Sequence, residues 1–474
     1  MQFPYYQFPW MGDGLIIAID AILHVFISHG IAIGVLTMIF VAEYIGYRRG
    51  SEQWEAFART ALKPTVIIIT GLGALTGVGI WFLTSVTVPA GIGSMLRVFF
   101  WPWFIEWAVF VGEVAVLLVY YFTWTRWRGE KKVVHVRLGL VYVVLAAASA
   151  FLITGILGFM LTPGGWEADR GFWGAFFNAT FLPQLAWRVC ISFSMGAMFI
   201  MAYLVFSYHR EPEWRRRALG FYAKVLAAPL VLMPVTGWWW YELIPAGLKT
   251  HAKPSLMMWA FEKRADLFWE VHVAAGVIMI ALIAVAWSRR VLATRILVVP
   301  AVLVVAFFVA EYERVREFVR GPYLMPGYMY ANSVLMTEHE LFREKGMLPY
   351  AEWFKRTAPD ATEEQEGAFL FAQNCGTCHT IGGKNDIVER FRGRPEDGIY
   401  VILGRTEQMV PWMPPFSGSD AERRKTARFL HGLTVKKVAS GQWPGGRQSV
   451  RSDKSDESER SDGSDDKDDS RGRQ

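Results

Sequence analysis

Long hydrophobic runs, separated by short polar stretches, fill roughly the first two thirds of the chain. A helix needs roughly 20 apolar residues to cross a bilayer, and about eight runs are long enough. They lie near 15–45, 64–86, 103–124, 136–161, 187–208, 218–240, 267–287 and 293–312. We expect Pro64, Pro183 and Pro300 near helix starts, and Pro229 and Pro234 inside the sixth helix, where they should kink it. The pattern predicts a polytopic bundle of membrane helices.

A different pattern begins near residue 360, where apolar positions recur at helical spacing between polar ones. The stretch TEEQEGAFLFAQNC (362–375) predicts a capped helix, and AERRKTARFLHGL (421–433) predicts a closing amphipathic helix. From about Gln448 the chain has almost no apolar residue, which is typical of disorder. The predicted fold is all-α, in four parts: a membrane bundle (1–330), a linker (331–359), a small helical domain (360–436) and a disordered polar tail (437–474).

Composition supports a membrane protein. Of 474 residues, 53% are hydrophobic and 19% are charged, which is too apolar for an ordinary soluble protein. The formal net charge is +6, but the basic residues lie in short loops between apolar runs, so we expect membrane lipid and no nucleic acid as a partner. Of the three cysteines, Cys190 lies in an apolar run and is expected to be a small core residue.

Most loops that are rich in lysine and arginine alternate along the chain, although the loop after the sixth run also carries Lys249, Lys253, Lys263 and Arg264. They follow the first, third, fifth and seventh runs, whereas the loops after the second and fourth carry only Arg97 and Arg170. The positive-inside rule then places both chain ends on the outer, periplasmic side of the cytoplasmic membrane. No Lys or Arg precedes Arg48, so we expect no cleavable signal peptide and a retained first helix.

The strongest motif is Cys375-Gly-Thr-Cys378-His379. This spacing is typical of a c-type haem attachment site, with two thioether bonds and one axial histidine. The expected second axial ligand is Met413, in Met-Pro-Pro-Phe, with Met409 as the alternative. The small domain is therefore predicted to be a cytochrome c domain with a covalent haem c. Such haems are attached on the outer side of the membrane, which agrees with the charge rule.

Ionisable residues inside membrane helices are costly and are functional candidates by default. They are His24, His29, Glu106, Glu113 and His272, with Glu311, Glu313 and Glu317 at the outer end of the last helix. By the assigned topology, four of them fall toward the outer half: His24, Glu106, His272 and Glu317. Neutral imidazole is a common iron ligand, so these groups indicate a membrane haem site. The alternative for each is a side chain satisfied by a neighbouring helix.

Three further histidines are less informative. His29 lies about 140° around the helix from His24, so the two face different ways. It could serve a second haem or a neighbouring helix, and the sequence leaves both open. His135 and His209 lie at inner helix ends beside basic loops, which favours an interfacial position.

Residues 10–330 resemble subunit I of the cytochrome bd oxidases. The similar stretches are AILHVFISHGIAIGVLTMIFVAEY, GLGALTGVGIWF, PWFIEWAVFVGE and SMGAMFIM. The resemblance implies that His24 binds the oxygen-reactive haem and that Glu106 and Glu113 lie beside the active haem pair. EFVRGPY resembles the family's Glu-x-Gly-Arg-Gln-Pro-Trp pattern. It implies Glu317 as ligand of the high-spin haem b, with Arg320 beside it.

The chain departs from this family at its low-spin haem b. Trp187 stands where the family has one ligand, a histidine. In FWEVHVA, Ala274 stands at the position of the other ligand, a methionine, and His272 at that of an arginine. The short segment 241–266 has no clear version of the family's quinol-binding loop. Both ligands of that haem and the quinol site are therefore expected to be lost.

We expect a terminal oxidase or reductase that is independent of quinol. Electrons would pass from an outer donor through haem c to a haem pair, of haem b or of haems b and d, which reduces oxygen or a related molecule such as nitric oxide. Glu106 and Glu113 would relay protons. A second membrane subunit, like subunit II of the family or a paralogue, is expected.

Two other hypotheses remain open. One is a non-catalytic electron-transfer subunit, in which His272 pairs with His24 or His29 around a relay haem. The other is a haem-based gas sensor or structural subunit.

Overall fold

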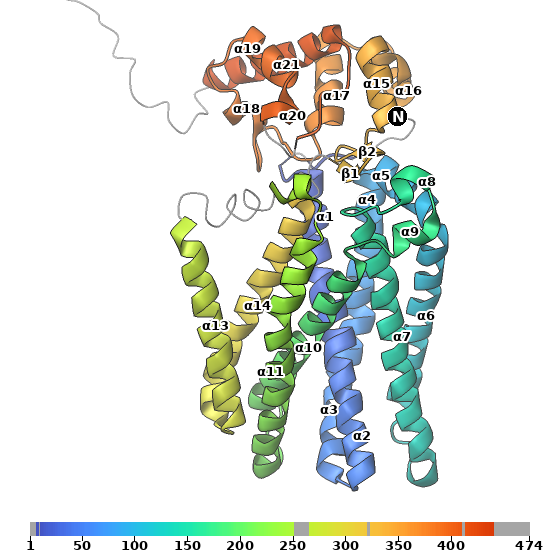
Figure 1. Ribbon diagram of the computed structural model, residues 1–474, viewed down its shortest axis with the longest axis vertical. Helices are drawn as coiled ribbons and strands as arrows, with labels where there is room; N and C mark the ends of the chain where they lie inside the picture. The colour runs from blue at the N-terminus through green and yellow to red at the C-terminus, as the bar shows by residue number, and fades with distance from the viewer. Residues whose placement is uncertain (1–5, 9, 251–264, 320–322, 410–412, 440–474) are drawn as a thin grey trace, which may run out of the picture.

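The computed structural model describes residues 6–8, 10–250, 265–319, 323–409 and 413–439. A long bundle of membrane helices carries a smaller helical domain at one end (Figure 1). Within the described residues, eight helical segments are long and apolar enough to cross a membrane, as predicted. They are Asp13–Arg49, Glu52–Thr87, Phe100–Thr123, Gly129–Phe159, Phe181–Phe206, Pro212–Glu242, Glu270–Trp287 and Val291–Glu313.

The first two spans each contain a π-helical segment between two α-helices. The bundle's elements are α1 (Asp13–Val25), η1 (Phe26–Val35), α2 (Leu36–Arg49), α3 (Glu52–Ile68), η2 (Ile69–Gly73), α4 (Ala74–Thr87), α5 (Pro89–Val98), α6 (Phe100–Thr123), η3 (Gly129–Lys131), α7 (Lys132–Phe159), α8 (Trp166–Asp169), α9 (Phe172–Phe176), α10 (Phe181–Phe206), α11 (Pro212–Glu242), α13 (Ala265–Trp287) and α14 (Val291–Val319). α13 and α14 stand at one side of the bundle, and α6 and α7 at the other (Figure 1).

Two predicted helix starts are wrong. α3 begins at Glu52 and α14 at Val291, so Pro64 and Pro300 lie well inside their helices. The apolar run marks only the most hydrophobic part of a helix, which begins after the helix itself has begun. The preceding polar residues still form backbone hydrogen bonds, and in α3 they bury Phe57 on one face. Pro183 lies in the first turn of α10, as expected, and α11 runs through Pro229 and Pro234.

The centre of the bundle is a close contact between η1 and α10. A Cβ added to Gly34 would lie 2.2 Å from the carbonyl oxygen of Ser192, and one added to Gly196 would lie 2.5 Å from the backbone of Gly34. Small residues let membrane helices approach backbone to backbone. This contact brings η1, which carries His29, directly against the helix that carries Trp187 and Arg188.

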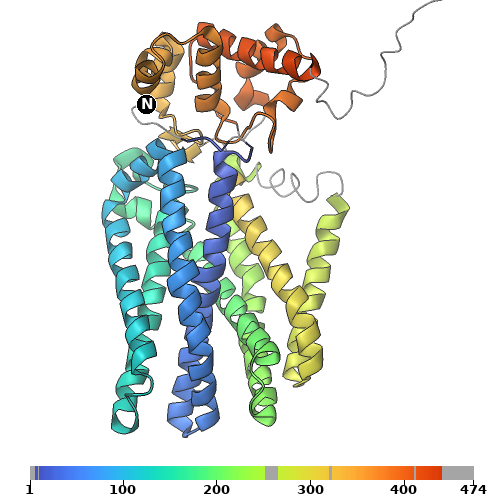
Figure 2. The same cartoon turned by 180° about the vertical axis from the view of Figure 1, so that it is seen from behind.

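The C-terminal domain lies over the end of the bundle where α1 begins (Figures 1 and 2). Two short strands, β1 (Tyr323–Met325) and β2 (Met329–Tyr330), form a hairpin that leads into it. Its helical elements are α15 (Met336–Lys345), η4 (Leu348–Tyr350), α16 (Glu352–Thr357), α17 (Glu363–Cys375), α18 (Ile387–Arg390), α19 (Glu396–Leu403), α20 (Thr406–Met409) and α21 (Asp420–Ala439). α17 matches its predicted helix, and Thr362 caps it as the sequence indicated. α21 begins as predicted but continues to Ala439, so residues 437–439 are helical and do not belong to a disordered tail.

Residues 331–359, predicted as a linker, include three short helical elements that pack on this domain. The Glu422 carboxylate accepts hydrogen bonds from the backbone N–H groups of Met347 and Leu348, each at 2.7 Å. His339 and Ser417 are joined by a hydrogen bond of 2.9 Å. The segment thus ties the hairpin to α21 and to the loop before it. The predicted tail lies outside the described residues from position 440 onward.

Candidate functional site

The predicted haem-attachment motif lies where α17 ends. The chain turns back on itself there, because the N–H groups of Cys378 and His379 donate to the carbonyl oxygen of Cys375, at 3.1 and 2.8 Å. The turn places two cysteine thiols and one imidazole together at the end of one helix. Cys378 is exposed, whereas Cys375 is partly buried against the domain core. That core includes Phe371, Ile387, Phe391, Ile399 and Leu403.

His379 is held in the form that binds iron. Only 9% of the residue is exposed, and its Nδ1–H faces the carbonyl oxygen of Asn385 at 3.3 Å, which leaves the Nε2 lone pair for a metal. Burial lowers the pKa of His379 to about 4, so the imidazole is neutral at physiological pH. Asn385 is itself fixed, because its side-chain amide donates to the carbonyl oxygen of Cys378 and accepts from Arg390.

The thiol of Cys375 and the two candidate methionines differ in how far they are buried. Burial, followed by the neighbouring Cys378, raises the pKa of the Cys375 thiol to about 12, as expected beside an apolar core. Of the two candidate methionine ligands, Met413 is half-buried and Met409 is 55% exposed. Met413 stays the better candidate on this ground. A hydrogen bond of 2.7 Å from the Thr406 hydroxyl to the carbonyl oxygen of Pro414 fixes the next turn of the loop.

His24 lies on α1 and faces α4. The Thr76 hydroxyl donates to the carbonyl oxygen of Leu72, so its oxygen accepts from the Nδ1–H of His24 at 3.0 Å. The imidazole therefore keeps its Nε2 lone pair. A Cβ added to Gly77 would lie 3.2 Å from the imidazole, so this glycine makes room for the ring.

Glu106 and Glu113 occupy one face of α6, about two turns or 10.5 Å apart along its axis. Each carboxylate accepts a hydrogen bond from α7: Glu106 from the Ser149 hydroxyl at 3.1 Å, and Glu113 from the Tyr142 hydroxyl at 2.7 Å. The Tyr142 oxygen also lies 3.1 Å from the carbonyl oxygen of Ala32 in η1. The two carboxylates thus form a polar line along α6 that leads toward η1.

The remaining predicted membrane ligands are less fully described. His272 on α13 packs edge-on against Phe308 of α14, with ring centroids 4.9 Å apart. Glu317 is part of α14, but its side chain lies outside the described residues, as do Arg320 and Pro322. Their roles stay predictions. Among the described residues, no three His, Cys, Asp or Glu side chains form a cluster able to hold a metal ion.

A buried charged cluster, which sequence reasoning missed as a unit, surrounds His29. Its Nε2 lies 3.1 Å from a guanidinium nitrogen of Arg188, and Arg188 reaches Glu313 at 3.5 Å. Glu313 also pairs with Arg316 at 3.0 Å. Because a guanidinium only donates, His29 must accept through Nε2, while its Nδ1 faces the Ser28 hydroxyl. Both ring nitrogens are therefore engaged by protein groups, which favours the neighbouring-helix interpretation over a haem ligand.

Trp187, which stands where the cytochrome bd subunit I family has a low-spin haem ligand, packs against other aromatic rings. Trp187 lies against Tyr312, with centroids 5.3 Å apart, and Tyr312 lies against Trp240 at 5.5 Å. A Cβ added to Gly237 would lie 3.5 Å from the Trp187 indole. An aromatic stack that joins α10, α11 and α14 thus stands at this place.

A second buried cluster lies toward the end of the bundle opposite the C-terminal domain. It corrects the expectation for His135, which is completely buried rather than interfacial. Its Nδ1 lies 2.5 Å from the Glu43 carboxylate, and its Nε2 lies 2.9 Å from the carbonyl oxygen of Tyr120. Lys132 reaches Glu43 at 2.6 Å, and the Tyr120 hydroxyl also donates to Glu43. A carboxylate inside the first apolar run was the signal that could have found this cluster.

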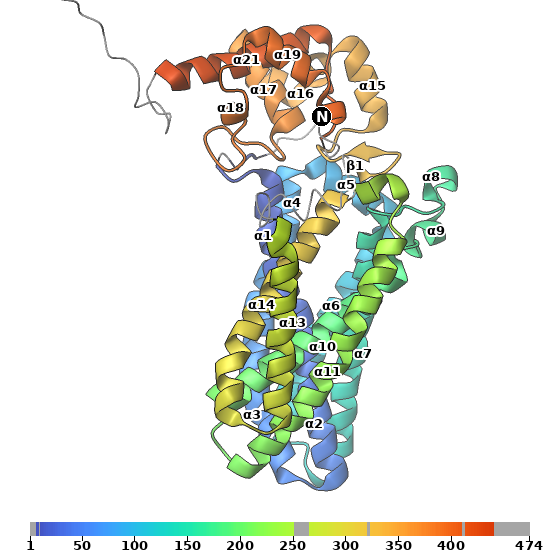
Figure 3. The same ribbon diagram turned by 60° about the vertical axis from the view of Figure 1, so that its left-hand side comes forward.

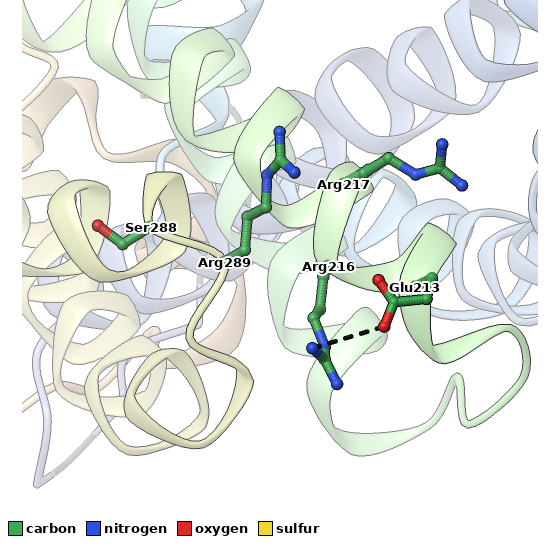
Figure 4. A pocket seen from close by; sticks show the side chains of 5 residues that line it. All are labelled: Glu213, Arg216, Arg217, Ser288 and Arg289. Carbon is green, nitrogen blue, oxygen red and sulfur yellow. Dashed lines mark ion pairs between the residues drawn. The ribbon is translucent and has the colours of Figure 1, made fainter.

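The same end of the bundle carries a groove lined by Glu213, Arg216, Arg217, Ser288 and Arg289 (Figure 4). Arg216 pairs with Glu213 at 3.5 Å, and both side chains are exposed. The groove lies where α11 begins and α13 ends, at the opposite end of the bundle from the C-terminal domain (Figure 1). It belongs to basic loops and contains none of the candidate haem ligands.

The bundle and its sites define a multi-pass membrane protein with the fold of a cytochrome bd subunit I. The family model described as cytochrome bd terminal oxidase subunit I matches residues 15–244. The protein "Putative cytochrome bd menaquinol oxidase subunit I" of Bacillus subtilis (strain 168) is 26% identical over 208 residues, which cover 43% of this chain and 46% of that protein. The membrane part is therefore similar to the cytochrome bd oxidase subunit I family over residues 15–244.

A solved structure agrees in fold. The structure of the bd oxidase from Geobacillus thermodenitrificans has a TM-score of 0.55 and 20% identity, and the match covers 68% of this chain and 90% of that chain. The chain spans about half of the length, 46%, of the curated relative that it matches. The matched residues of the family model end at 244, so the C-terminal domain is interpreted from its own motif and geometry.

Proposed function

We propose that this chain is the catalytic subunit of a cytochrome bd-like oxidase or reductase that receives electrons through its own c-type haem. When bound, the haems would carry electrons from an outer donor to a haem pair that reduces oxygen or a related small molecule. The observation that carries the proposal is the His379 imidazole, neutral and with Nε2 available, beside two cysteine thiols in a loop that contacts the start of α1.

Within the membrane, His24 would hold one haem, of type b or d. The Thr76 hydroxyl fixes its tautomer, and Gly77 leaves space beside its ring. Glu317 and Arg320 would hold the second haem, on the strength of the family resemblance. The side chains of α14 that are described, Glu311 and Glu313, are buried at the same end of the helix.

Protons would reach the site along α6. The Glu113 carboxyl can hold a proton on the oxygen that does not accept from Tyr142, and Glu106 lies on the same face of the helix. Transfer between the two carboxyls, about 10.5 Å apart along the axis, would need intervening water molecules as carriers. Ser149 orients the Glu106 carboxyl. This assignment gives both glutamates a role in proton delivery rather than in iron binding.

Quinol would not be the electron donor. The stack of Trp187, Tyr312 and Trp240 occupies the place of a low-spin haem ligand, which supports the loss of that haem. The relay alternative requires His272 to pair with His24 or His29. The engagement of His29 by Arg188 and Ser28 leaves that alternative with the pair His272 and His24 only.

The remaining assignments follow from the same proposal. The C-terminal domain would face the periplasm, and a second membrane subunit like subunit II of the family would complete the enzyme.

The tests are a haem stain of a denaturing gel and a reduced-minus-oxidised spectrum with and without carbon monoxide. We expect a stained band and a high-spin haem that binds carbon monoxide. Only low-spin haem, with no carbon monoxide binding, would replace this proposal by the relay alternative.

A further inference from the structure

The N-terminal residues lie between the C-terminal domain and the membrane bundle. We call residues 6–8 and 10–14 the strap. The strap leads directly into α1, and its N–H at Tyr6 donates to the carbonyl oxygen of Val86 near the end of α4, at 2.7 Å. The Asp13 carboxylate, almost fully buried, accepts from the N–H of Phe8 at 3.1 Å. The strap is thus folded back on itself and fixed to the outer end of the bundle.

The other side of the strap contacts the loop between α17 and α18, residues 376–386, which we call the haem-attachment loop. The N–H of Gly14 donates to the carbonyl oxygen of Thr377, inside the Cys-x-x-Cys motif, at 3.0 Å. The N–H of Lys384 donates to the carbonyl oxygen of Trp10 at 2.7 Å. These two bonds run in opposite directions, one donated by the strap and one by the loop. A third bond, from the Gln7 side-chain amide to the carbonyl oxygen of Ala372, has a length of 3.1 Å.

Glycines allow this contact. A Cβ added to Gly383 would lie 2.3 Å from Cα of Trp10 and 2.4 Å from its carbonyl oxygen. Those atoms are backbone, so they cannot turn away as a flexible side chain would. A Cβ added to Gly14 would lie 3.3 Å from the carbonyl oxygen of Thr377. The loop and the strap therefore touch main chain to main chain, which fixes their separation more tightly than side-chain contacts can.

We propose that the strap is a positioning element that locks the haem-attachment loop onto the outer end of α1. Gly14 bonds to the loop, and His24 lies ten residues further along the same helix, a rise of about 15 Å. The distance between the two expected haem positions is therefore set by one helix of one chain. This inference rests on the proposed function, and it excludes a C-terminal domain that swings freely on residues 331–359. The transfer concerned moves one electron from reduced haem c to the oxidised membrane haem, with no atom exchanged.

The variant that tests the strap is Gly383→Leu in the full-length protein. The added side chain would displace Trp10, whereas the backbone of Gly383 itself does not require glycine. Gly432→Leu is the matched control, because a Cβ at Gly432 in α21 meets no atom within 4 Å. Hydrogen–deuterium exchange of the peptides that contain Gly14 and Lys384 is the first readout. We expect exchange at least tenfold faster in Gly383→Leu and within twofold of wild type in the control.

The second readout is the single-turnover rate at which reduced haem c is reoxidised by the membrane haem. We expect at least a tenfold decrease in Gly383→Leu, with haem stain and carbon monoxide binding retained, and an unchanged rate in Gly432→Leu. An unchanged rate and unchanged exchange in Gly383→Leu overturn the strap while leaving the proposed function intact. A wild-type protein that never reoxidises haem c overturns both.

If Gly383→Leu does not take up haem, a second variant tests the strap. Gln7→Ala leaves the attachment loop unchanged and removes only the bond to Ala372. We expect exchange at Gly14 and Lys384 to become several-fold faster and the reoxidation rate to fall several-fold. Wild-type values for both quantities in Gln7→Ala overturn the proposal.

Discussion

At the scale of single residues, the attachment motif gives the sharpest prediction. Cys375→Ala removes one of the two thioether bonds that hold the expected haem. Haem stain of this chain on a denaturing gel should be lost or strongly reduced. Cys190→Ala is the matched control, because Cys190 is also a cysteine without a disulfide but lies in α10, away from the motif. Equal staining of Cys375→Ala and wild type would contradict the assignment.

The environment of His379 gives a prediction about pH. Burial lowers its pKa from 6.5 to about 4, so above pH 6.5 the imidazole is neutral in both the folded and the unfolded chain. As the pH falls toward 4, the unfolded chain binds a proton that the folded domain excludes, and stability is lost. The loss should reach about 3 kcal/mol, and an iron bond acts in the same direction because it needs neutral imidazole.

The measurement is the thermal midpoint of the C-terminal domain, followed by haem absorbance in the full-length protein between pH 7 and pH 4. The midpoint should fall with pH, mainly below pH 6.5. A midpoint that stays constant, or rises, over this range would show that His379 is not buried in its neutral form.

The membrane ligands can be ranked by two substitutions. His24→Ala removes the expected iron ligand and should delete or convert a membrane haem, while the covalent haem stays. His272→Ala removes a ring that packs against Phe308 and should change the haem content little. Optical spectra of the two purified variants are the measurement. Loss of a b-type signal in His272→Ala, without carbon monoxide binding in wild type, would favour the relay.

The role of a residue could be predicted where it belongs to a motif of neighbouring positions. It could not be predicted where the role depends on a side chain far away in the sequence. Cys375, Cys378 and His379 are adjacent, so their motif could be recognised. The role of His29 remained open because its partner Arg188 lies 159 positions away. His135 was misplaced for the same reason, since Glu43 reaches it from another helix. Asn385, which orients His379, gave no signal in the sequence.

At the scale of elements, the contact between η1 and α10 should be essential for the fold. Gly196→Leu would place a side chain within 2.5 Å of the Gly34 backbone and force the two helices apart. We expect it to abolish accumulation of folded protein in the membrane. Gly276→Leu in α13 is the control, because its Cβ meets no atom within 4 Å. Yield and the elution profile in detergent are the measurements, and two equal profiles would contradict this role of the contact.

The number of membrane spans was predictable because the bilayer sets a minimum apolar length. Helix starts were not, since helices such as α3 begin in polar sequence before the membrane. The π-helical segments in the first two spans also had no signature, although they change which face each side chain presents.

At the scale of the whole molecule, two helical parts are joined end to end (Figure 3), and the strap lies at their junction. The side of the membrane expected for the C-terminal domain followed from the charges of the loops. Its contact with the strap did not, because backbone bonds such as that between Gly14 and Thr377 depend on no particular side chain. The hairpin and residues 331–359 fix the same domain from the other side.

The central claim is that electrons enter through the C-terminal domain and not from quinol. Oxygen consumption by the purified protein tests it most directly, with either a one-electron cytochrome donor or a simple quinol as reductant, in wild type and in Cys375→Ala. The account predicts consumption with the cytochrome donor in wild type, its loss in Cys375→Ala, and none with quinol in either protein. Quinol-driven consumption that persists in Cys375→Ala would contradict it.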